Sequence, residues 1–357
     1  MTCNSPTGIA PVLQLHPTRR CNLACAHCYT SSGPKVMEQL DWHMLSICLQ
    51  DAASLGYRQL AVSGGEPLLY PHLDKLLAQA RALGMLTSIT TNGMLLTPAR
   101  WAQISGLLEV VAVSVDGTAG EHDAIRGQHG AFARMLANLA LIRASNVPFG
   151  LIFTLTQHNV DSLEFVVQLA AQQGARSVQV HPLTLYGRAA DTMADARPDA
   201  QELLAALAEA ARLGRQLGVA VQVDALSAEQ LQNYRSHLVP QQPVTRLTAV
   251  APVLIVQADG AVVPLTHDVN RQLWLGSLYD ASLPTLAREW LQAGQGDRLA
   301  HACAQTWEQL NAPLELNGMA EPAESAALYW YDEVAAMTRS LANARPIRPI
   351  HVMQAAN

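Results

Sequence analysis

Three cysteines, Cys21, Cys25 and Cys28, lie within one stretch of eight residues. A structural zinc site normally has four protein ligands, so zinc would need His27 or a distant residue as the fourth. A cubane iron–sulfur cluster usually has cysteine ligands, and three of them leave one iron open for a small molecule. Core packing is the third alternative, although Asn22 and His27 in this stretch are not typical of a core. The spacing therefore favours an iron–sulfur centre.

The triad directly follows the first of six short β-rich segments that alternate with amphipathic ones. This rhythm indicates repeated βα units around a parallel sheet. Right-handed crossovers curve such strands into a full or partial barrel, with the loops after the strands gathered at one mouth. The expected strands are Val12–Pro17, Gln59–Ser63, Thr87–Thr91, Val110–Val115, Gly150–Thr154 and Ser177–His181. The expected helices between them are Leu45–Leu55, Leu73–Leu83, Pro98–Leu107, Ala131–Ala144 and Ser162–Gln173.

The pattern changes after Gly187, where a polar, irregular segment precedes an Ala/Leu-rich helix. Further expected elements are the helices Asp199–Leu217 and Pro284–Leu291 and the strands Val219–Val223, Leu254–Gln257 and Ala261–Pro264. The last two strands flank an Asp-Gly turn that is typical of a hairpin. We therefore predict an α/β fold, a partial (β/α)6 TIM-like barrel with a smaller α+β C-terminal extension. The predicted divisions are a flexible N-terminus at 1–10, the barrel at 11–190, the extension at 191–310 and a tail at 311–357.

Composition excludes several classes of protein. The 357 residues are half apolar and carry a net charge of −6, which argues against disorder and against nucleic acid as a partner. No apolar run is long enough to suggest a membrane span, and the N-terminus lacks a secretory signal. We predict a cytoplasmic protein with no membrane partner.

Further motifs follow the triad in chain order. They are Ser63-Gly-Gly-Glu-Pro67, Thr90-Thr-Asn-Gly93, Ser114-Val-Asp-Gly117, His122-Asp-Ala-Ile-Arg-Gly127 and Gly187-Arg-Ala189. In this combination the sequence resembles the radical S-adenosylmethionine (radical SAM) superfamily over about residues 12 to 190. The resemblance implies a [4Fe-4S] cluster and S-adenosylmethionine as cofactors. It also implies an enzyme that cleaves S-adenosylmethionine reductively and uses the 5′-deoxyadenosyl radical to abstract hydrogen from a substrate.

The resemblance also implies roles for individual residues. Cys21, Cys25 and Cys28 would ligate the cluster, and the remaining residues would shield it or bind the cofactor. Gly64 and Gly65 would admit the methionine end, and Glu66 would face its amino group. Arg126 would pair with the methionine carboxylate. The other expected contacts are Tyr29 beside the cluster, Thr91 and Asn92 unless they only form a turn, Ser114 and Asp116 toward polar groups of the cofactor, and Thr154 and His181 toward adenine or substrate.

The second half resembles a SPASM or twitch extension, in which cysteines bind auxiliary clusters. Leu265 stands where a cysteine usually follows Pro264, and Cys303 is the only cysteine downstream. We therefore expect a degenerate extension without a cluster, which favours redox-neutral reactions such as epimerisation or rearrangement. Cys303 is a candidate hydrogen donor, with a leftover core thiol as the alternative. Tyr186 is a weaker candidate donor.

Two groups of substrates fit this resemblance, peptides and small metabolites. Because only twenty residues precede Cys21, a peptide substrate would need recognition by the C-terminal half or by a separate peptide-recognition protein. A flavodoxin- or ferredoxin-type protein is the expected electron donor. The alternatives to an enzyme are a non-catalytic iron–sulfur or metal-binding sensor and an accessory scaffold. The Ser-Gly-Gly-Glu-Pro and Ser-Val-Asp-Gly motifs argue against the sensor, because a structural metal site has no use for them.

Overall fold

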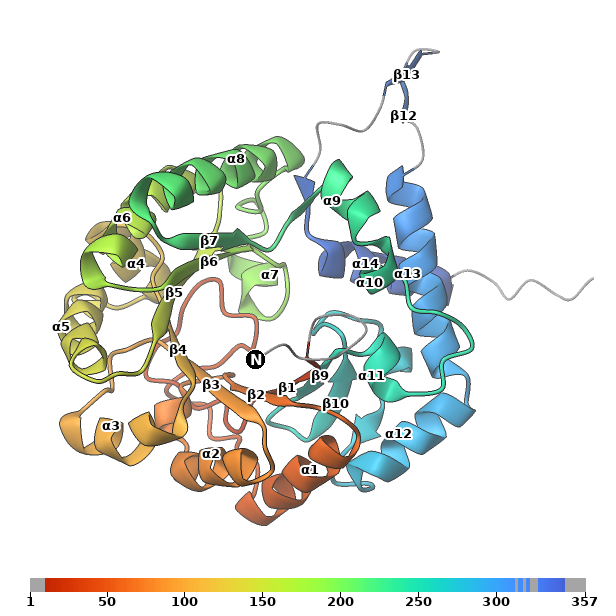
Figure 1. Cartoon of the computed structure of the whole chain (residues 1–357), viewed down its shortest axis with the longest axis horizontal. Helices are drawn as coiled ribbons and strands as arrows, with labels where there is room; N and C mark the ends of the chain where they lie inside the picture. Colours follow the sequence, from red (N-terminus) through yellow and green to blue (C-terminus); the bar gives the residue numbers. More distant parts are fainter. Residues whose placement is uncertain (1–9, 312–313, 317–318, 322–326, 344–357) are drawn as a thin grey trace, which may run out of the picture.

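The computed structural model describes residues 10–311, 314–316, 319–321 and 327–343. Its first half alternates strands and helices, and Figure 1 shows the strands curving along the inside of a ring of helices. The parallel strands of this half are β1 (Val12–Leu15), β2 (Gln59–Val62), β3 (Leu86–Thr91), β4 (Val110–Ser114), β5 (Phe149–Leu155) and β6 (Ser177–Pro182). All six predicted strands are therefore confirmed, in the predicted order.

Five predicted helices cover the outside of these strands. They are α1 (Trp42–Ser54), α2 (Leu73–Ala82), α3 (Pro98–Ile104), α5 (Ala131–Arg143) and α6 (Leu163–Gln173). Local capping explains several starts: Asp41 accepts hydrogen bonds from the first amides of α1, and Thr97 caps α3 ahead of Pro98. Short 3-10 turns join the elements at Pro67–Leu69, Ser105–Leu107, Val160–Ser162 and Arg271–Leu273.

Helix α4 (Ala119–Arg126) was not among the predicted helices. Thr118 and Glu121 form a capping box at its start, and Gly127 ends it in the left-handed conformation. The spacing Thr-x-x-Glu ahead of Gly was the sequence signal for this helix. Its consequence is functional, because α4 carries Arg126 inward from its last turn.

The sheet contains ten strands in the order β11-β10-β9-β1-β2-β3-β4-β5-β6-β7. Strand β7 (Ala220–Val223) continues the parallel sheet beyond β6, and β9 (Val253–Val256) pairs in parallel with the other side of β1. The predicted hairpin is present: β10 (Ala261–Pro264) runs antiparallel to β9, and β11 (Gly276–Ser277) antiparallel to β10. The order begins at β11 and ends at β7, so the sheet is open. The extension thus continues the barrel sheet, while the predicted domain divisions remain predictions.

Most of the remaining elements lie at the right of Figure 1; of the first two helices after β6, the short one lies near the centre and the longer one at the upper left, outside β7. The helices are α7 (Arg188–Thr192), α8 (Ala200–Leu217), α9 (Ala228–Asn233), α10 (Arg235–Leu238), α11 (Leu247–Val250), α12 (Leu283–Gln292), α13 (Gln295–Asn311) and α14 (Trp330–Asn343). The short strands are β8 (Leu226–Ser227), β12 (Leu314–Leu316), β13 (Met319–Glu321) and β14 (Ala327–Leu328). Helices α8 and α12 match predictions. Helix α7 corrects the expected irregular segment, and α13 and α14 were not predicted.

Along each strand, successive side chains point alternately toward the helices, where they form the core, and toward the inner face of the sheet. In β1, Leu13 and Leu15 are fully buried, whereas Gln14 between them lines a cavity. In β5, Phe153 is buried and Thr154 lines the same cavity. Each buried Leu contributes about 2 kcal/mol of burial free energy. The helix-facing side chains therefore stabilise the sheet, and the side chains of the opposite face can line the cavity. None of the described helices is long and apolar enough to cross a membrane.

Candidate active site

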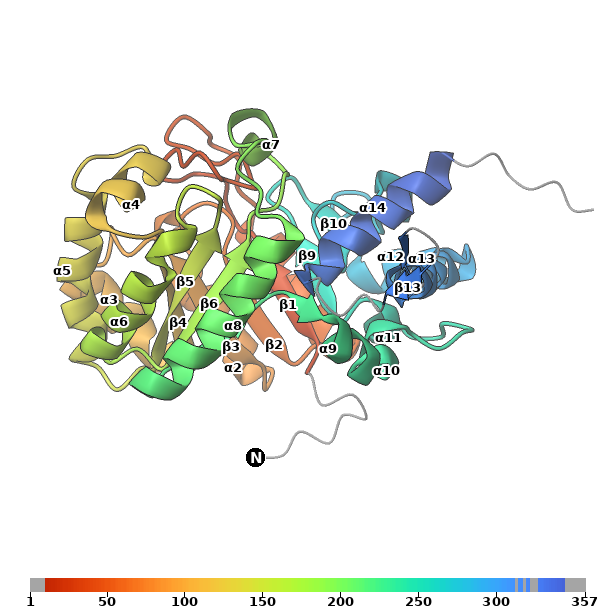
Figure 2. The same cartoon turned by 90° about the horizontal axis from the view of Figure 1, so that it is seen from above.

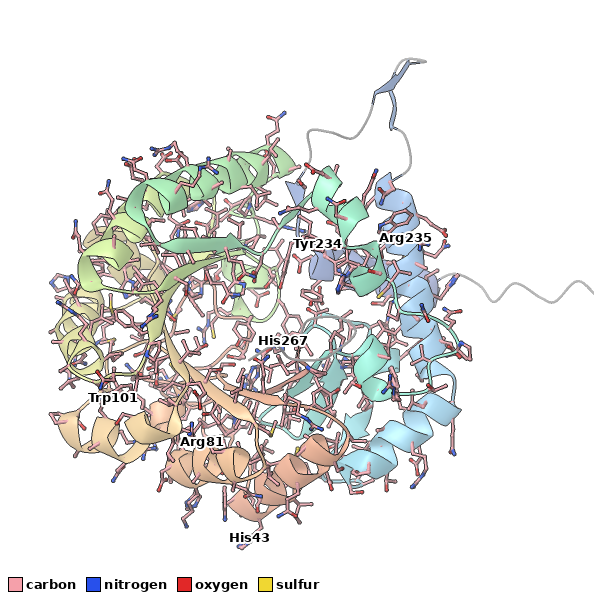
Figure 3. All side chains as sticks on the ribbon, viewed as in Figure 1. His43, Arg81, Trp101, Tyr234, Arg235 and His267 are labelled. Atoms are coloured by element: carbon pink, nitrogen blue, oxygen red, sulfur yellow. The ribbon has the colours of Figure 1, made fainter. Side chains whose placement is uncertain are left out.

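A cavity of about 310 Å³ lies at the carboxyl ends of the parallel strands. The extension also contributes to its wall, and Figure 3 shows His267 inside the ring of strands. The predicted site residues that line it are Cys21, Cys25, Cys28, Tyr29, Gly64, Gly65, Glu66, Thr91, Asn92, Ser114, Arg126, Thr154 and His181. Asp116 and Cys303 are the predicted residues that do not line it. The structure therefore brings nearly the whole predicted site together.

The cysteine loop, defined as residues 21–32, joins β1 to the segment before α1. Hydrogen-bond donors already surround its sulfur atoms. Leu23 N lies 3.5 Å from Cys21 Sγ, and Ser32 N lies 3.3 Å from Cys28 Sγ. Burial raises the pKa of Cys21 to about 12 and also raises that of Cys25. The thiolate forms therefore need added positive charge, as a bound metal centre supplies.

The cysteine loop offers a donor set that fits an iron–sulfur cluster. Three thiols from one loop face the cavity, and no fourth cysteine is among the described residues that line it. Cys48 in α1 and Cys303 in α13 instead belong to the hydrophobic core. Within the described ranges, no three His, Cys, Asp or Glu side chains are placed to hold a single metal ion. Three cysteine ligands with N–H donors at the sulfurs are the set that a [4Fe-4S] cluster with one open iron requires.

Cys303 does not reach the cavity. It lies in α13, where it is 2 % exposed, and burial raises its pKa to about 12. The structure thus corrects its candidate role as hydrogen donor, because the helix turns this thiol into the core rather than toward the other site residues. The alternative of a core thiol describes its position.

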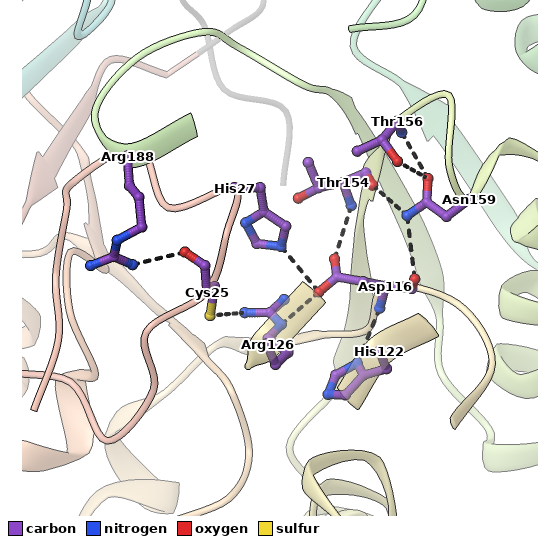
Figure 4. A network of polar contacts seen from close by, with 9 residues as sticks. All are labelled: Cys25, His27, Asp116, His122, Arg126, Thr154, Thr156, Asn159 and Arg188. Carbon is purple, nitrogen blue, oxygen red and sulfur yellow. Dashed lines mark hydrogen bonds and ion pairs between the residues drawn. The ribbon is translucent and has the colours of Figure 1, made fainter. Parts of the chain in front are cut away.

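Asp116 is the centre of a buried polar network, shown in Figure 4. Its carboxylate accepts a hydrogen bond from Arg126 Nε at 2.5 Å and lies 3.1 Å from His27 Nε2. Thr154 N and Asn159 Nδ2 bond to its other carboxylate oxygen and its carbonyl oxygen. Burial alone would raise the pKa of Asp116, but Arg126 and His27 outweigh it and hold the pKa well below its usual range. Asp116 thus holds neighbours that line the cavity, and its contact with a cofactor stays a prediction.

Arg126 is oriented by this network toward the cysteine loop. Its Nη1 lies 3.7 Å from Cys25 Sγ, while its Nε is held by Asp116. In the described part of the chain, no acceptor is bonded to its Nη2. The guanidinium therefore joins the base of the cavity to the second cysteine and keeps a donor for an anionic group.

Glu66 joins the loops that follow β2 and β3. Its carboxylate accepts hydrogen bonds from Leu68 N at 3.1 Å, Thr91 Oγ1 at 2.8 Å and Asn92 N at 2.9 Å. The side chain is 1 % exposed, and burial raises its pKa. Asn92 Nδ2 reaches in turn to Asn22 Oδ1 at 2.9 Å in the cysteine loop. Thr91 and Asn92 thus brace the loops and also line the cavity, while their contact with a cofactor stays a prediction.

Gly65 is required by contact with the segment after β1. A Cβ at this position would lie 2.3 Å from Arg20 O, and one at Gly64, where φ is +97°, would lie 2.7 Å from His16 Cβ. The two glycines let the β2 loop pack directly on the start of the cysteine loop. They line the cavity as expected, but the close approaches seen in the structure are to Arg20 O and His16 Cβ.

Residues 15–170 match the Radical SAM superfamily. This range contains the cysteine loop, Glu66 and the network around Asp116. This part of the chain is a radical SAM domain.

Relatives of this chain include a peptide cyclase and a pre-heme d1 synthase. The PqqA peptide cyclase of Ruegeria pomeroyi is 36% identical over 216 residues, which are 57% of this chain and 56% of the relative. The pre-heme d1 synthase of Dinoroseobacter shibae is 32% identical over 180 residues, 50% of this chain and 45% of the relative. The chain thus spans about half the length of these curated relatives.

A solved structure resembles nearly the whole chain. The anSMEcpe structure with bound AdoMet (S-adenosylmethionine) has a TM-score of 0.60 and 15% identity, and the match covers 93% of this chain and 98% of that one. At this identity the likeness concerns the fold. It extends the resemblance beyond the radical SAM domain into the C-terminal extension.

The extension supplies residues that the sequence did not reveal as part of the site. Thr266, His267 and Asp268 follow β10, and Tyr329 and Asp332 lie at the start of α14; all line the cavity. The His267 ring stacks on His16, with centroids 5.0 Å apart, and lies 4.7 Å from the Tyr29 ring. No local signal could have placed these residues, since only pairing of β9 with β1 brings the loop after β10 to the site.

His181 faces the cavity from the end of β6 and is paired with Asp224. The ion pair joins His181 Nδ1 to Asp224 Oδ2, and Gln179 Nε2 donates to both oxygens of the same carboxylate at 3.3 Å. Burial opposes the charged imidazole, but the Asp224 carboxylate outweighs burial and raises the pKa of His181. Asp224, directly after β7, is a further residue that sequence reasoning missed.

His122 gives the radical SAM domain a testable pH dependence. It is 1 % exposed, accepts a hydrogen bond from Asp116 N at its Nδ1, and has a pKa lowered to about 4, first by burial and then by the Arg126 charge. Between pH 6.5 and pH 4 the unfolded chain therefore binds a proton that the folded state rejects. This lowers the free energy of unfolding by about 2 kcal/mol at pH 5 relative to pH 7.

We expect His122→Gln to reduce this loss of stability on acidification. Urea unfolding of the metal-free protein at pH 5 and pH 7 measures the difference, and the wild type is the reference because His16 and His267 also have lowered pKa values. An identical change with pH in both proteins would contradict the role of His122.

Proposed function

We propose that this chain is a radical SAM enzyme with one [4Fe-4S] cluster that acts on a peptide or a small metabolite. The observation that carries the proposal is the cavity itself, which is lined by three thiols of one loop and by residues of the four motifs that follow β2, β3 and β4. When bound, the cluster supplies the electron that cleaves the C5′–S bond of S-adenosylmethionine to methionine and a 5′-deoxyadenosyl radical, which takes a hydrogen atom from the substrate.

Cys21, Cys25 and Cys28 would hold the cluster and leave one iron open. The N–H donors at their sulfur atoms stabilise negative charge there, which is one of the means by which a protein tunes such a cluster. Tyr29, next to the last ligand, would limit access of water from the side of the extension. Its hydroxyl lies 3.4 Å from Ser63 Oγ, at the end of the β2 strand.

S-adenosylmethionine would lie along the ends of β2 to β6. Glu66 would face the amino group, since it is a buried carboxylate on the cavity wall, and a cation beside it favours its ionised form. Arg126 would bind the carboxylate through the donor that Asp116 leaves free. Gly64 and Gly65 would leave space for the methionine end. The further contacts would be Thr91, Asn92 and Ser114 near the polar groups and Thr154 and His181 near adenine or substrate.

The substrate would meet the extension side of the cavity, where His267, Tyr329 and Asp332 form the wall. A peptide is supported by the PqqA peptide cyclase relative and by the structure of anSMEcpe with bound AdoMet and Cp18Cys peptide. A metabolite is supported by the pre-heme d1 synthase relative. We further propose a cytoplasmic enzyme that receives electrons from a flavodoxin- or ferredoxin-type donor and, for a peptide, uses a separate recognition protein.

Anaerobic reconstitution tests this function directly. Iron and sulfide are counted, dithionite and S-adenosylmethionine are added, and 5′-deoxyadenosine is measured on the same sample. We expect about four irons per chain and deoxyadenosine formation, whereas about eight irons would indicate an auxiliary cluster. An intact cluster without cleavage would favour the sensor or the scaffold. Failure to bind any iron would refute the assignment of the triad.

A further inference from the structure

The Gly187-Arg188-Ala189 motif has no task in the proposed function, yet it lies directly on the cysteine loop. Helix α7 starts at Arg188. Figure 2 shows this short helix beside the cysteine loop, beyond the same ends of the strands. The motif comes about 160 residues after the loop in the chain. Hydrogen bonds from Arg188 to Cys25 and Ser32 nevertheless join the two segments in space.

Arg188 donates to three carbonyl groups of the cysteine loop. Its Nη1 lies 2.8 Å from Cys25 O, its Nη2 lies 2.6 Å from Ser32 O, and its backbone N lies 2.9 Å from Cys28 O. Two of these carbonyls belong to cluster-ligand candidates, and the third lies four residues beyond the last ligand. One residue therefore fixes the second half of the loop at three separate points.

Residues next to Arg188 allow α7 to pack closely on the cysteine loop. Gly187 has a φ of +62°, and a Cβ there would lie only 2.2 Å from Tyr29 O, so a side chain would push α7 off the loop. Thr192 Oγ1, at the other end of α7, donates to Ala26 O at 2.8 Å. The whole of α7 is thus fitted to residues 25–32.

Cys25 lies between two guanidinium groups in Figure 4. Arg126 approaches its Sγ from inside the network of Asp116, and Arg188 bonds its carbonyl oxygen from the opposite side. The two arginines differ in what holds them. Arg126 is neutralised by Asp116, whereas the guanidinium of Arg188 is bonded to carbonyl oxygens of the loop, which carry no net charge.

We propose that Arg188 is a positioning residue that holds the cysteine loop in its ligating conformation before a cluster is present and adds an uncompensated positive charge beside it. This inference rests on the proposed function, since it concerns the same loop. Hydrogen bonds from a charged group are stronger than neutral ones, and a ligand set held in place loses less entropy on binding. A positive charge near the cluster favours its reduced, more negative state.

The first test uses the metal-free protein and needs no cofactor. Hydrogen exchange of the peptide covering residues 25–33 is compared in wild type, Arg188→Gln, Arg188→Lys and the control Arg143→Gln, whose guanidinium contacts Gln173 at the far end of α5. We expect Arg188→Gln to increase exchange in this peptide at least about tenfold, with strand peptides unchanged. Arg143→Gln should match wild type, and Arg188→Lys, which keeps the charge but not the planar fork, should fall between.

The second test uses the reconstituted protein. Arg188→Gln should release iron to a chelator several-fold faster than wild type, and the midpoint potential of its cluster should be more negative. Arg188→Lys should restore the potential but not the slow release, which separates charge from hydrogen bonding. If Arg188→Gln fails to fold, the comparison of Arg188→Lys with wild type still tests the inference.

The outcomes of the two tests are separable. Equal loop exchange and equal iron release in wild type and Arg188→Gln would overturn the inference while leaving the proposed function intact. A wild-type protein that binds no cluster would refute the proposed function, and the exchange experiment would still decide whether Arg188 orders the loop.

Discussion

Cys25→Ala is expected to abolish cluster binding and with it the cleavage of S-adenosylmethionine. The thiol is 7 % exposed, lines the cavity and receives Arg126 Nη1. Its loss would leave two of the three proposed ligands, too few to hold a cluster. Iron after reconstitution should fall from about four per chain to near zero, and deoxyadenosine formation should fall more than about a hundredfold.

The chain contains a matched control for this prediction. Cys303→Ala also removes one buried thiol, but from the core of the extension beside α14 rather than from the cavity. It should keep the iron content and the cleavage rate of wild type while lowering stability slightly. Full iron in Cys25→Ala, or iron lost equally in both variants, would show that the triad is not the ligand set.

Asp116→Ala is expected to cause the largest loss of stability, about 3–5 kcal/mol in the free energy of unfolding. The carboxylate is 0 % exposed and compensates the buried Arg126, which is itself 7 % exposed. Removing it leaves the guanidinium in the interior without an anion and leaves His27 without its partner. Urea unfolding of the metal-free protein measures the loss without interference from cofactors.

Glu109→Gln is the corresponding control, because it breaks the ion pair between Glu109 and Arg81 on the surface. Exposed ion pairs contribute about 0–1 kcal/mol, so this variant should unfold close to wild type. A similar, small loss in both variants would mean that Arg126 finds another partner when Asp116 is removed, and that the network is not the support of the site.

Much of the site could be predicted because parallel strands bring their carboxyl ends together. Thr91, Thr154 and His181 each end a predicted strand, Ser114 is next to the end of one, and all four line the cavity. That argument needs only the strand pattern, which is local in the sequence. It could not say which side chains contact one another, so Asp116 was expected on the cavity wall instead of beneath it.

The residues that were missed depend on contacts between distant segments. His267 and Asp332 reach the site only because β9 pairs with β1 and α14 returns to the mouth of the barrel. The two alternatives for Cys303, hydrogen donor and core thiol, could not be separated for a related reason. It lies in a helix that was not predicted, and its direction depends on which face of α13 packs on the core.

The pairing of β1 with β9 has a consequence for the order of events during synthesis. Strand β1 lies between β2 and β9, and Val253 is made about 240 residues after its partner Val12. At translation rates of about 5–20 residues per second, β1 remains a sheet edge for roughly 10–50 s after it leaves the ribosome. The cysteine loop starts from the end of this strand, so the strand that carries it gains its second neighbour only after the segment up to Val256 has been made.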